Sequence, residues 1–217
     1  MKRFFIAFSF CFFLIPFSFA SAHQPYLVGK EKQVTVTNPE ISKAYYGEFS
    51  GSPVVFTINE NKPFKLYVGV LVPDQFGVLT DVSAKIQKDS KLMAFLSATS
   101  TNWARFYEPF GGDAYYQGPE IRSNALPGIY SITVSRPGNS GKYVVAIGET
   151  ESFTVNETIR TLKVLPFLKS EFFGKSVWTA YLNRIGLYFG IGLVGIFITL
   201  MLLCSFFKKL FSLLRKK

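Results

Sequence analysis

The residues of this sequence that could do chemistry are few, and the first of them is its one histidine, His23. Behind a cleaved export signal, His23 would carry a free α-amino group beside its imidazole, a pair of nitrogen ligands that chelates Cu(II). A copper centre built on such a pair needs a second histidine from the fold, and the sequence has none. Because chain ends are commonly disordered, we interpret His23 as a residue at a frayed terminus.

The shortage of histidine and cysteine excludes most nucleophilic and metal chemistry. Ser-His-Asp and Cys-His systems need a histidine partner, and Cys11 and Cys204 lie in the two apolar segments described below. Histidine-rich zinc or iron sites are excluded for the same reason. A Ser-Lys dyad or a carboxylate pair fits the composition, but no spacing indicates one. We therefore expect a protein that is not an enzyme and that needs no cofactor.

Aromatic side chains gather instead in residues 102–120, around Gly111 and Gly112. The aromatic members are Trp103, Phe106, Tyr107, Phe110, Tyr115 and Tyr116, and the acidic members are Glu108, Asp113 and Glu120. Aromatic groups beside glycine and acidic residues can form a sugar-stacking platform, a protein hot spot or a calcium site. We predict a loop whose aromatic residues bind a partner. The alternative is a crossover whose aromatics cover the edge of the core.

The three acidic residues match no regular calcium-binding loop, so the sequence leaves a metal ion at this segment open. A second candidate contact is residues 38–48, where Tyr45 and Tyr46 stand among charged and polar residues. We interpret that stretch as an Asn-Pro turn that enters an edge strand.

The fold that must position these segments is predicted by short alternating or aromatic-rich runs between Gly, Pro, Asn and Asp. The predicted strands are residues 33–37, 43–49, 54–59, 64–72, 82–87, 128–135 and 142–148. Their number and spacing favour an antiparallel, jelly-roll-like β-sandwich over residues 23–150. We predict that the last two strands form a hairpin, since residues 136–140 have typical turn chemistry.

Residues 151–184 are predicted to form a juxtamembrane helical stalk. Asn156 is a candidate helix cap, and Pro166 is a candidate end of the helix. Residues 185–207 contain no charged side chain, and the basic tail 208–217 follows them. This pattern predicts a transmembrane helix with its C-terminus in the cytoplasm. Gly186 and Gly190 lie on one face of that helix, which would let a second copy approach and form a homodimer.

At the other end, Lys2 and Arg3 precede an apolar run at residues 4–19 and the small residues 20–22. This order predicts a cleavable signal peptide over residues 1–22. An uncleaved anchor is the alternative, but Pro16 interrupts the run. The expected product is a single-pass membrane protein whose N-terminus lies outside, on the periplasmic or extracellular face.

This layout also accounts for the net charge of +10, a positive charge of the kind that nucleic-acid-binding proteins carry. Residues 23–183 hold sixteen Lys and Arg against fourteen Asp and Glu, a net charge of +2. The remaining positive charges lie in the signal, at the membrane helix and in the tail. We therefore expect no nucleic-acid partner.

The two strands 128–134 and 141–148 resemble the closing hairpin of jelly-roll modules such as the pre-peptidase C-terminal domains of secreted bacterial proteins. That resemblance covers about twenty residues and implies a β-sandwich accessory module rather than an enzyme. The whole layout resembles membrane-anchored bacterial proteins with such a module. It is also similar to the p24 cargo receptors of the early secretory pathway. The sequence departs from that second family because it lacks the sandwich disulfide, the coiled coil and a complete dilysine signal.

Two functions from different classes follow from these observations. The first is a membrane-tethered, non-enzymatic module outside the cytoplasm that recognises a protein or glycan partner through the aromatic segment. The second is an accessory subunit of a membrane complex, or a p24-like cargo receptor, assembled through the transmembrane helix.

Overall fold

The computed structural model describes residues 23–29 and 31–215. The predicted signal peptide lies outside these residues. The described chain divides into one compact unit that ends at Ala180 and another that begins at Tyr181. Each unit is described by itself below.

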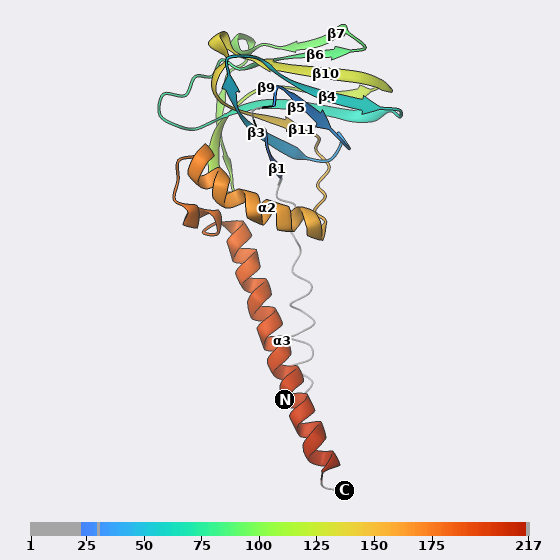
Figure 1. The fold of residues 1–217 in the computed structure, drawn as a ribbon, viewed down its shortest axis with the longest axis vertical. Coiled ribbons are helices and arrows are strands. Elements are labelled where there is room, and N and C mark those ends of the chain that lie inside the picture. The colour runs from blue at the N-terminus through green and yellow to red at the C-terminus, as the bar shows by residue number, and fades with distance from the viewer. Residues whose placement is uncertain (1–22, 30, 216–217) are drawn as a thin grey trace. The chain divides into compact units, whose positions relative to one another are not determined.

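Two β-sheets form the first unit, which confirms the predicted β-sandwich (Figure 1). The six-stranded sheet has the order β1 (Gln24–Leu27), β3 (Lys43–Ser50), β11 (Ser140–Ile147), β5 (Phe64–Pro73), β9 (Asp113–Ala125), β8 (Ala104–Glu108). The five-stranded sheet has the order β2 (Gln33–Val36), β4 (Val54–Glu60), β10 (Gly128–Ser135), β6 (Ser83–Lys88), β7 (Lys91–Leu96). Neighbouring strands are antiparallel except β1 with β3 and β2 with β4. The short 3₁₀ turns η2 (Ala98–Ser100) and η3 (Pro137–Asn139) connect strands.

The main core lies between the two sheets and follows from the period of two along each strand. In β4 the buried residues alternate with half-buried or exposed ones, and the same alternation recurs in β10. The five-stranded sheet contributes Phe56, Ile58, Tyr130, Ile132 and Val134, and the six-stranded sheet contributes Leu66, Val68, Val70, Tyr143 and Val145. Removal of this apolar surface from water is the main force that holds the sheets together.

The predicted hairpin between β10 and β11 is wrong. β10 pairs with β4 and β6 in the five-stranded sheet, whereas β11 pairs with β3 and β5 in the six-stranded sheet. Residues 136–139 therefore cross from one sheet to the other. The Arg136 side chain is buried at this crossing and its guanidinium lies 2.8 Å from the Asp81 carboxylate. Turn-forming residues permit a tight reversal, but they do not determine whether the next strand joins the same sheet.

The segment that follows the sandwich folds back onto it. Helix α2 (Val155–Phe167) continues into a π-helical turn, η4 (Leu168–Phe172), and a 3₁₀ turn, η5 (Val177–Ala180). Leu168, Phe172 and Phe173 form a second apolar cluster with Ala44, Tyr115 and Val144 on the outer face of the six-stranded sheet. This sheet therefore buries both faces, one under the other sheet and one under the C-terminal segment.

Two details of the predicted helix are corrected. Thr154 rather than Asn156 caps α2, and its hydroxyl accepts a hydrogen bond of 3.2 Å from the Glu157 amide. Pro166 lies inside the helix rather than at its end. Because the chain continues into the π-helical turn after Pro166, the residues that follow it stay packed on the sheet.

The second unit contains one long helix, α3 (Arg184–Leu214). Its residues Arg184–Lys208 have a mean hydropathy of 2.4, so this helix is long and apolar enough to cross a membrane. A Cβ atom at Gly186 would lie 1.6 Å from the carbonyl oxygen of Tyr181, within the turn that begins the helix. A Cβ atom at Gly190 meets nothing within 4 Å. Of the two glycines in the predicted helix-contact face, Gly190 is the one with open space beside it.

Candidate functional site

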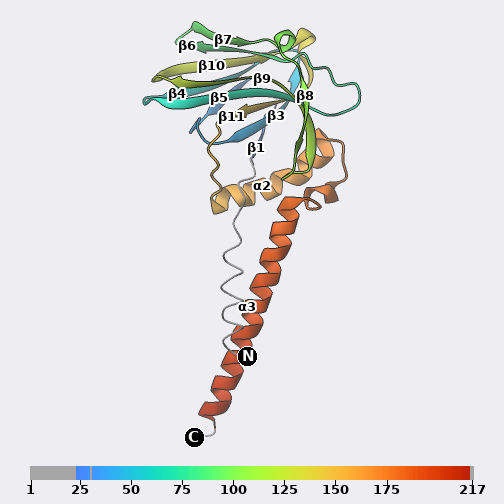
Figure 2. The same cartoon turned by 180° about the vertical axis from the view of Figure 1, so that it is seen from behind.

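The aromatic segment is an edge hairpin of the six-stranded sheet rather than the predicted loop. β8 pairs with β9 from Ala104 opposite Gln117 to Glu108 opposite Asp113, and residues 109–112 turn between them. Figure 2 shows this hairpin running toward the segment that follows α2. On its other side β9 pairs with β5, so β8 is the terminal strand of the sheet.

The structure distributes the six aromatic residues between the core and the surface. Trp103 and Tyr116 pack against the main core, and the Trp103 indole N–H donates to the Ala98 carbonyl at 3.0 Å. Tyr115 is buried in the second cluster, and its hydroxyl lies 3.0 Å from that of Tyr46. Phe110 is half-buried in the turn. The crossover alternative thus describes these four aromatics better than a partner-binding loop does.

Phe106 and Tyr107 are the two aromatic residues of this segment that remain exposed. Their exposed fractions are 37% and 59%, and they lie next to each other on β8. Alternation along a strand directs them to opposite faces of the sheet. The Phe106 ring lies 6.5 Å from the Tyr115 ring, on the side of the second cluster.

The three acidic candidates are held by separate protein partners. Glu120 accepts a hydrogen bond from the Tyr67 hydroxyl at 3.0 Å and pairs with Arg122. Glu108 accepts hydrogen bonds of 2.6 Å from the amides of Phe110 and Gly111. Within the described ranges, no group of three or more His, Cys, Asp or Glu side chains is placed to hold a metal ion.

Asp113 is bound by two lysines from the C-terminal segment. Its carboxylate oxygens lie 2.5 Å from the Lys169 ammonium and 2.8 Å from that of Lys175. Burial lowers the pKa of Lys169, although its hydrogen bond to Asp113 opposes that shift. Burial also raises the pKa of Glu108, although the hydrogen bonds from the amides of the turn oppose this shift. This cluster at the tip of the hairpin is formed by residues far apart in the sequence.

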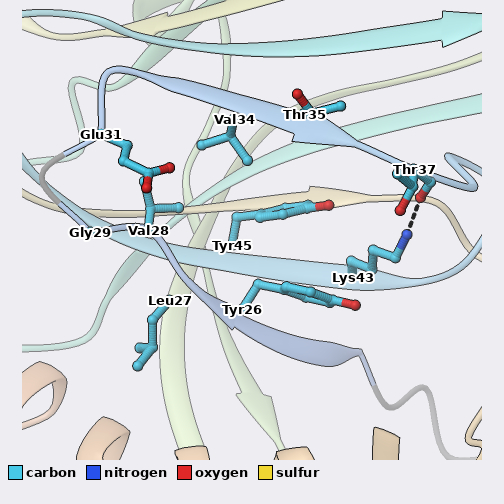
Figure 3. A pocket seen from close by; sticks show the side chains of 10 residues that line it. All are labelled: Tyr26, Leu27, Val28, Gly29, Glu31, Val34, Thr35, Thr37, Lys43 and Tyr45. Atoms are coloured by element: carbon cyan, nitrogen blue, oxygen red, sulfur yellow. Dashed lines mark hydrogen bonds between the residues drawn. The ribbon is translucent and has the colours of Figure 1, made fainter.

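A cavity of about 170 Å³ lies at the opposite edge of the sandwich, between β1 and β2 (Figure 3). The Tyr26 and Tyr45 rings stack in it with centroids 5.3 Å apart, and the Lys43 amine donates to the Thr37 carbonyl. Ten residues line the cavity: Tyr26, Leu27, Val28, Gly29, Glu31, Val34, Thr35, Thr37, Lys43 and Tyr45. It is smaller than the roughly 300–1,000 Å³ of usual ligand pockets.

The cavity uses part of the second candidate segment, but the strand there is not an edge strand. β3 lies between β1 and β11, so the prediction of an edge strand is wrong. Its neighbour β1 was missed in the sequence because it contains Pro25, a residue type that usually argues against a strand. Burial lowers the pKa of Lys43, which lines the cavity. The Arg160 guanidinium stacks on Tyr26, 3.7 Å from its ring centroid.

His23 is not at a frayed terminus. Its Nδ1 is hydrogen-bonded to the Ser42 hydroxyl, and Gln24 next to it pairs with Lys43 in the sheet. Burial lowers the pKa of the His23 imidazole below its ordinary value of 6.5, partly opposed by the charge of Glu149. The structure therefore favours the neutral imidazole at this position.

This shift predicts that His23 makes the fold less stable in mild acid. Above the unfolded pKa of 6.5 both states are neutral, and stability falls as the pH drops through that value because the unfolded state binds the proton better. Unfolding by urea should be compared at about pH 7.5 and about pH 5.5 for the wild type and His23→Gln. We expect a smaller loss of stability in the variant. An equal loss in both proteins would assign the effect to other groups.

No protein-family model and no curated protein sequence matches this chain. Among solved structures, it is similar to the pre-peptidase C-terminal domain of a collagenase from Bacillus anthracis, at 15% identity and a TM-score of 0.32. That match covers 58% of this chain and 95% of the other. A β-glucosidase from Paenibacillus barengoltzii matches at 9% identity and a TM-score of 0.27, over 58% of this chain and 13% of the enzyme. CorA, a surface-associated copper-binding protein of Methylomicrobium album BG8, matches at 8% identity and a TM-score of 0.28, over 58% and 100%. At such low identities and TM-scores, these likenesses carry no site, ligand or activity over to this chain.

Proposed function

We propose that the chain is a membrane-tethered, non-enzymatic module outside the cytoplasm that binds a protein partner at strand β8. The supporting observation is that β8 exposes Phe106 and Tyr107 at the edge of the sandwich. Aromatic residues are enriched among those that dominate binding energy at protein interfaces.

The position of β8 favours an extended protein segment over a glycan. β8 pairs with β9 along one side and has no strand on its other side in the part of the chain that the structure describes. An unpaired edge presents main-chain N–H and C=O groups to which a partner can add a strand. Phe106 and Tyr107 would then flank the added strand, one on each face of the sheet.

Both ends of β8 are held in place before any partner binds. Arg105 near its start pairs with Asp74 at 2.7 Å, and Asp113, opposite the last residue of β8, is bound by Lys169. An edge that is already ordered loses little conformational entropy on binding. A partner strand would therefore pair with a β8 that already has its bound conformation.

The test is photo-cross-linking in the native membrane. A photoreactive amino acid replaces Tyr107 in one variant of the full chain and Phe95 in the other. Phe95 is a matched control because it is also an exposed aromatic residue on an edge strand, β7, with an exposed fraction of 60%. We expect one defined protein adduct at position 107 that Phe106→Ser abolishes.

Three outcomes would contradict the proposal. Adducts of equal yield at positions 107 and 95 would indicate nonspecific contact, and no protein adduct at 107 would exclude a protein partner there. An adduct to a glycan would keep the site but change the class of partner.

A further inference from the structure

Lys169 and Asp113 form an ion pair that is unusually well shielded from water. The side chain of Lys169 is 1% exposed and that of Asp113 is 5% exposed. In each of the other ion pairs among residues 23–29 and 31–215, at least one side chain is more than one-fifth exposed. The Lys169 amine also donates to the Gly111 carbonyl.

Apolar and aromatic groups exclude water from this pair. Lys169 stands between Leu168 and Phe172 in the π-helical turn, and both of these neighbours belong to the second cluster together with Phe173 and Tyr115. The amine lies 5.7 Å from the centroid of the Phe173 ring. Desolvation of two charges in such a site carries a large free-energy cost that their attraction offsets only in part. A reaction that removes both charges is therefore favoured here more than in water.

We propose that Lys169 and Asp113 condense into an intramolecular amide bond. The Lys169 Nζ lies 2.5 Å from Oδ2 of Asp113, and the carboxyl carbon is one bond farther on. Two groups held this close react as one molecule, without the entropy cost of an encounter. The product is a neutral amide that leaves no buried charge on either side chain.

The atoms of the reaction balance without any other reagent. A proton passes from the Lys169 ammonium to Oδ2 of Asp113, which leaves a neutral amine beside a carboxylic acid. The nitrogen lone pair then forms a C–N bond with the Asp113 carbon, and the electrons of the C=O bond move to Oδ1. The nitrogen loses a second proton, the C–Oδ2 bond breaks, and Oδ2 leaves as water.

Two neighbouring side chains are placed to assist these steps. The Lys175 ammonium lies 2.8 Å from Oδ1, where negative charge develops during the attack. Glu108 is the cross-strand partner of Asp113, and both carboxylates flank Gly111. A carboxyl group there can take the proton from nitrogen and give it to the departing oxygen. Burial raises the pKa of Glu108, which brings it closer to the range suited to proton transfer.

The bond would fix the hairpin that carries β8 to the segment that leads into the membrane helix. It closes a chain segment whose ends are 56 positions apart. A covalent closure of this kind restricts the unfolded chain in the way a disulfide does. Among the described residues the one cysteine, Cys204, lies in the membrane helix, so no disulfide can provide this restraint in the sandwich.

The bond is tested on the full chain, purified in detergent, denatured and digested with trypsin. Without the bond, trypsin releases residues 106–122 and cuts after Lys169. With the bond, cleavage after Lys169 is blocked, and residues 106–122 appear joined to residues 164–175. The joined species is lighter than the sum of the two peptides by one water molecule. Because this test is read on the denatured wild type, it does not depend on whether any variant folds.

Matched variants assign the roles. Lys169→Arg keeps the charge but should abolish the joined peptide, whereas Lys163→Arg, at an exposed position of α2, should retain it. Glu108→Gln, checked for folding by circular dichroism, should slow bond formation by about a hundredfold. Unmodified peptides from the wild type would overturn the proposal, and a link through Lys175 would overturn the assignment to Lys169. If folded Glu108→Gln forms the bond at the wild-type rate, Glu108 takes no part in the reaction.

Discussion

Replacement of Trp103 by alanine is expected to lower the free energy of unfolding of the sandwich by about 3 kcal/mol, at the low end for buried Trp→Ala changes. Trp103 packs against the main core, and its indole N–H donates to the Ala98 carbonyl. Its ring also lies over Gly118 of β9, where a Cβ atom would come within 2.4 Å of it. Loss of the ring would leave a cavity between β9 and the residues that follow β7.

The comparison that tests this result is Tyr107→Ala. Tyr107 belongs to the same segment but is 59% exposed, so its removal should change stability by less than about 0.5 kcal/mol. Urea unfolding of the full chain in detergent, followed by circular dichroism, measures both variants without relying on tryptophan fluorescence. A Trp103→Ala protein as stable as the wild type would contradict the structural role of Trp103 and would favour the prediction that Trp103 binds a partner.

The alternating segments of the sandwich were predictable from the sequence. All seven predicted strands are present, with ends that differ by at most two residues. Their signal was strong because one face of each strand is buried in the main core. The missed strand β7 gives no such signal, since Leu92 and Phe95 are exposed although Leu96 is buried in the core.

Strand β9 was missed for a different reason. Gly118 and Pro119 interrupt it, and both residue types usually mark a loop. The structure accommodates them in a bulge, since the pairing shifts between Gly69 and Leu71 on the neighbouring strand β5. Proline is tolerated at a bulge, and Gly118 makes room for the Trp103 ring.

The candidate site was predictable only in part. The sequence indicated the segment that contains Phe106 and Tyr107, but exposure depends on which residues the rest of the chain covers. Lys169 gave no signal, because a lysine among apolar residues also fits a helix at a membrane surface. Its pairing with Asp113 depends on the docking of the C-terminal segment onto the six-stranded sheet, which no local pattern encodes.

Alanine at Gly148 is expected to destabilise the sandwich by about 3–5 kcal/mol, from left-handed backbone strain together with overpacking. Gly148 follows β11 with a φ of +79°, and its amide donates to the Tyr67 carbonyl at 3.2 Å. A Cβ atom there would lie 2.4 Å from the Ile41 carbonyl oxygen and 2.6 Å from that of Pro39. These are backbone atoms, so they cannot move aside as the end of a flexible side chain could.

Gly51 provides the control for this change, because it has nearly the same φ without the obstruction. Its φ is +80°, and a Cβ atom at Gly51 meets nothing within 4 Å. Gly51→Ala should therefore cost only the backbone strain, about 1 kcal/mol. The difference between the two variants in urea unfolding isolates the contact of residue 148 with residues 39–41. Equal losses of stability would mean that this contact relaxes and that the turn before β3 is not fixed by the end of β11.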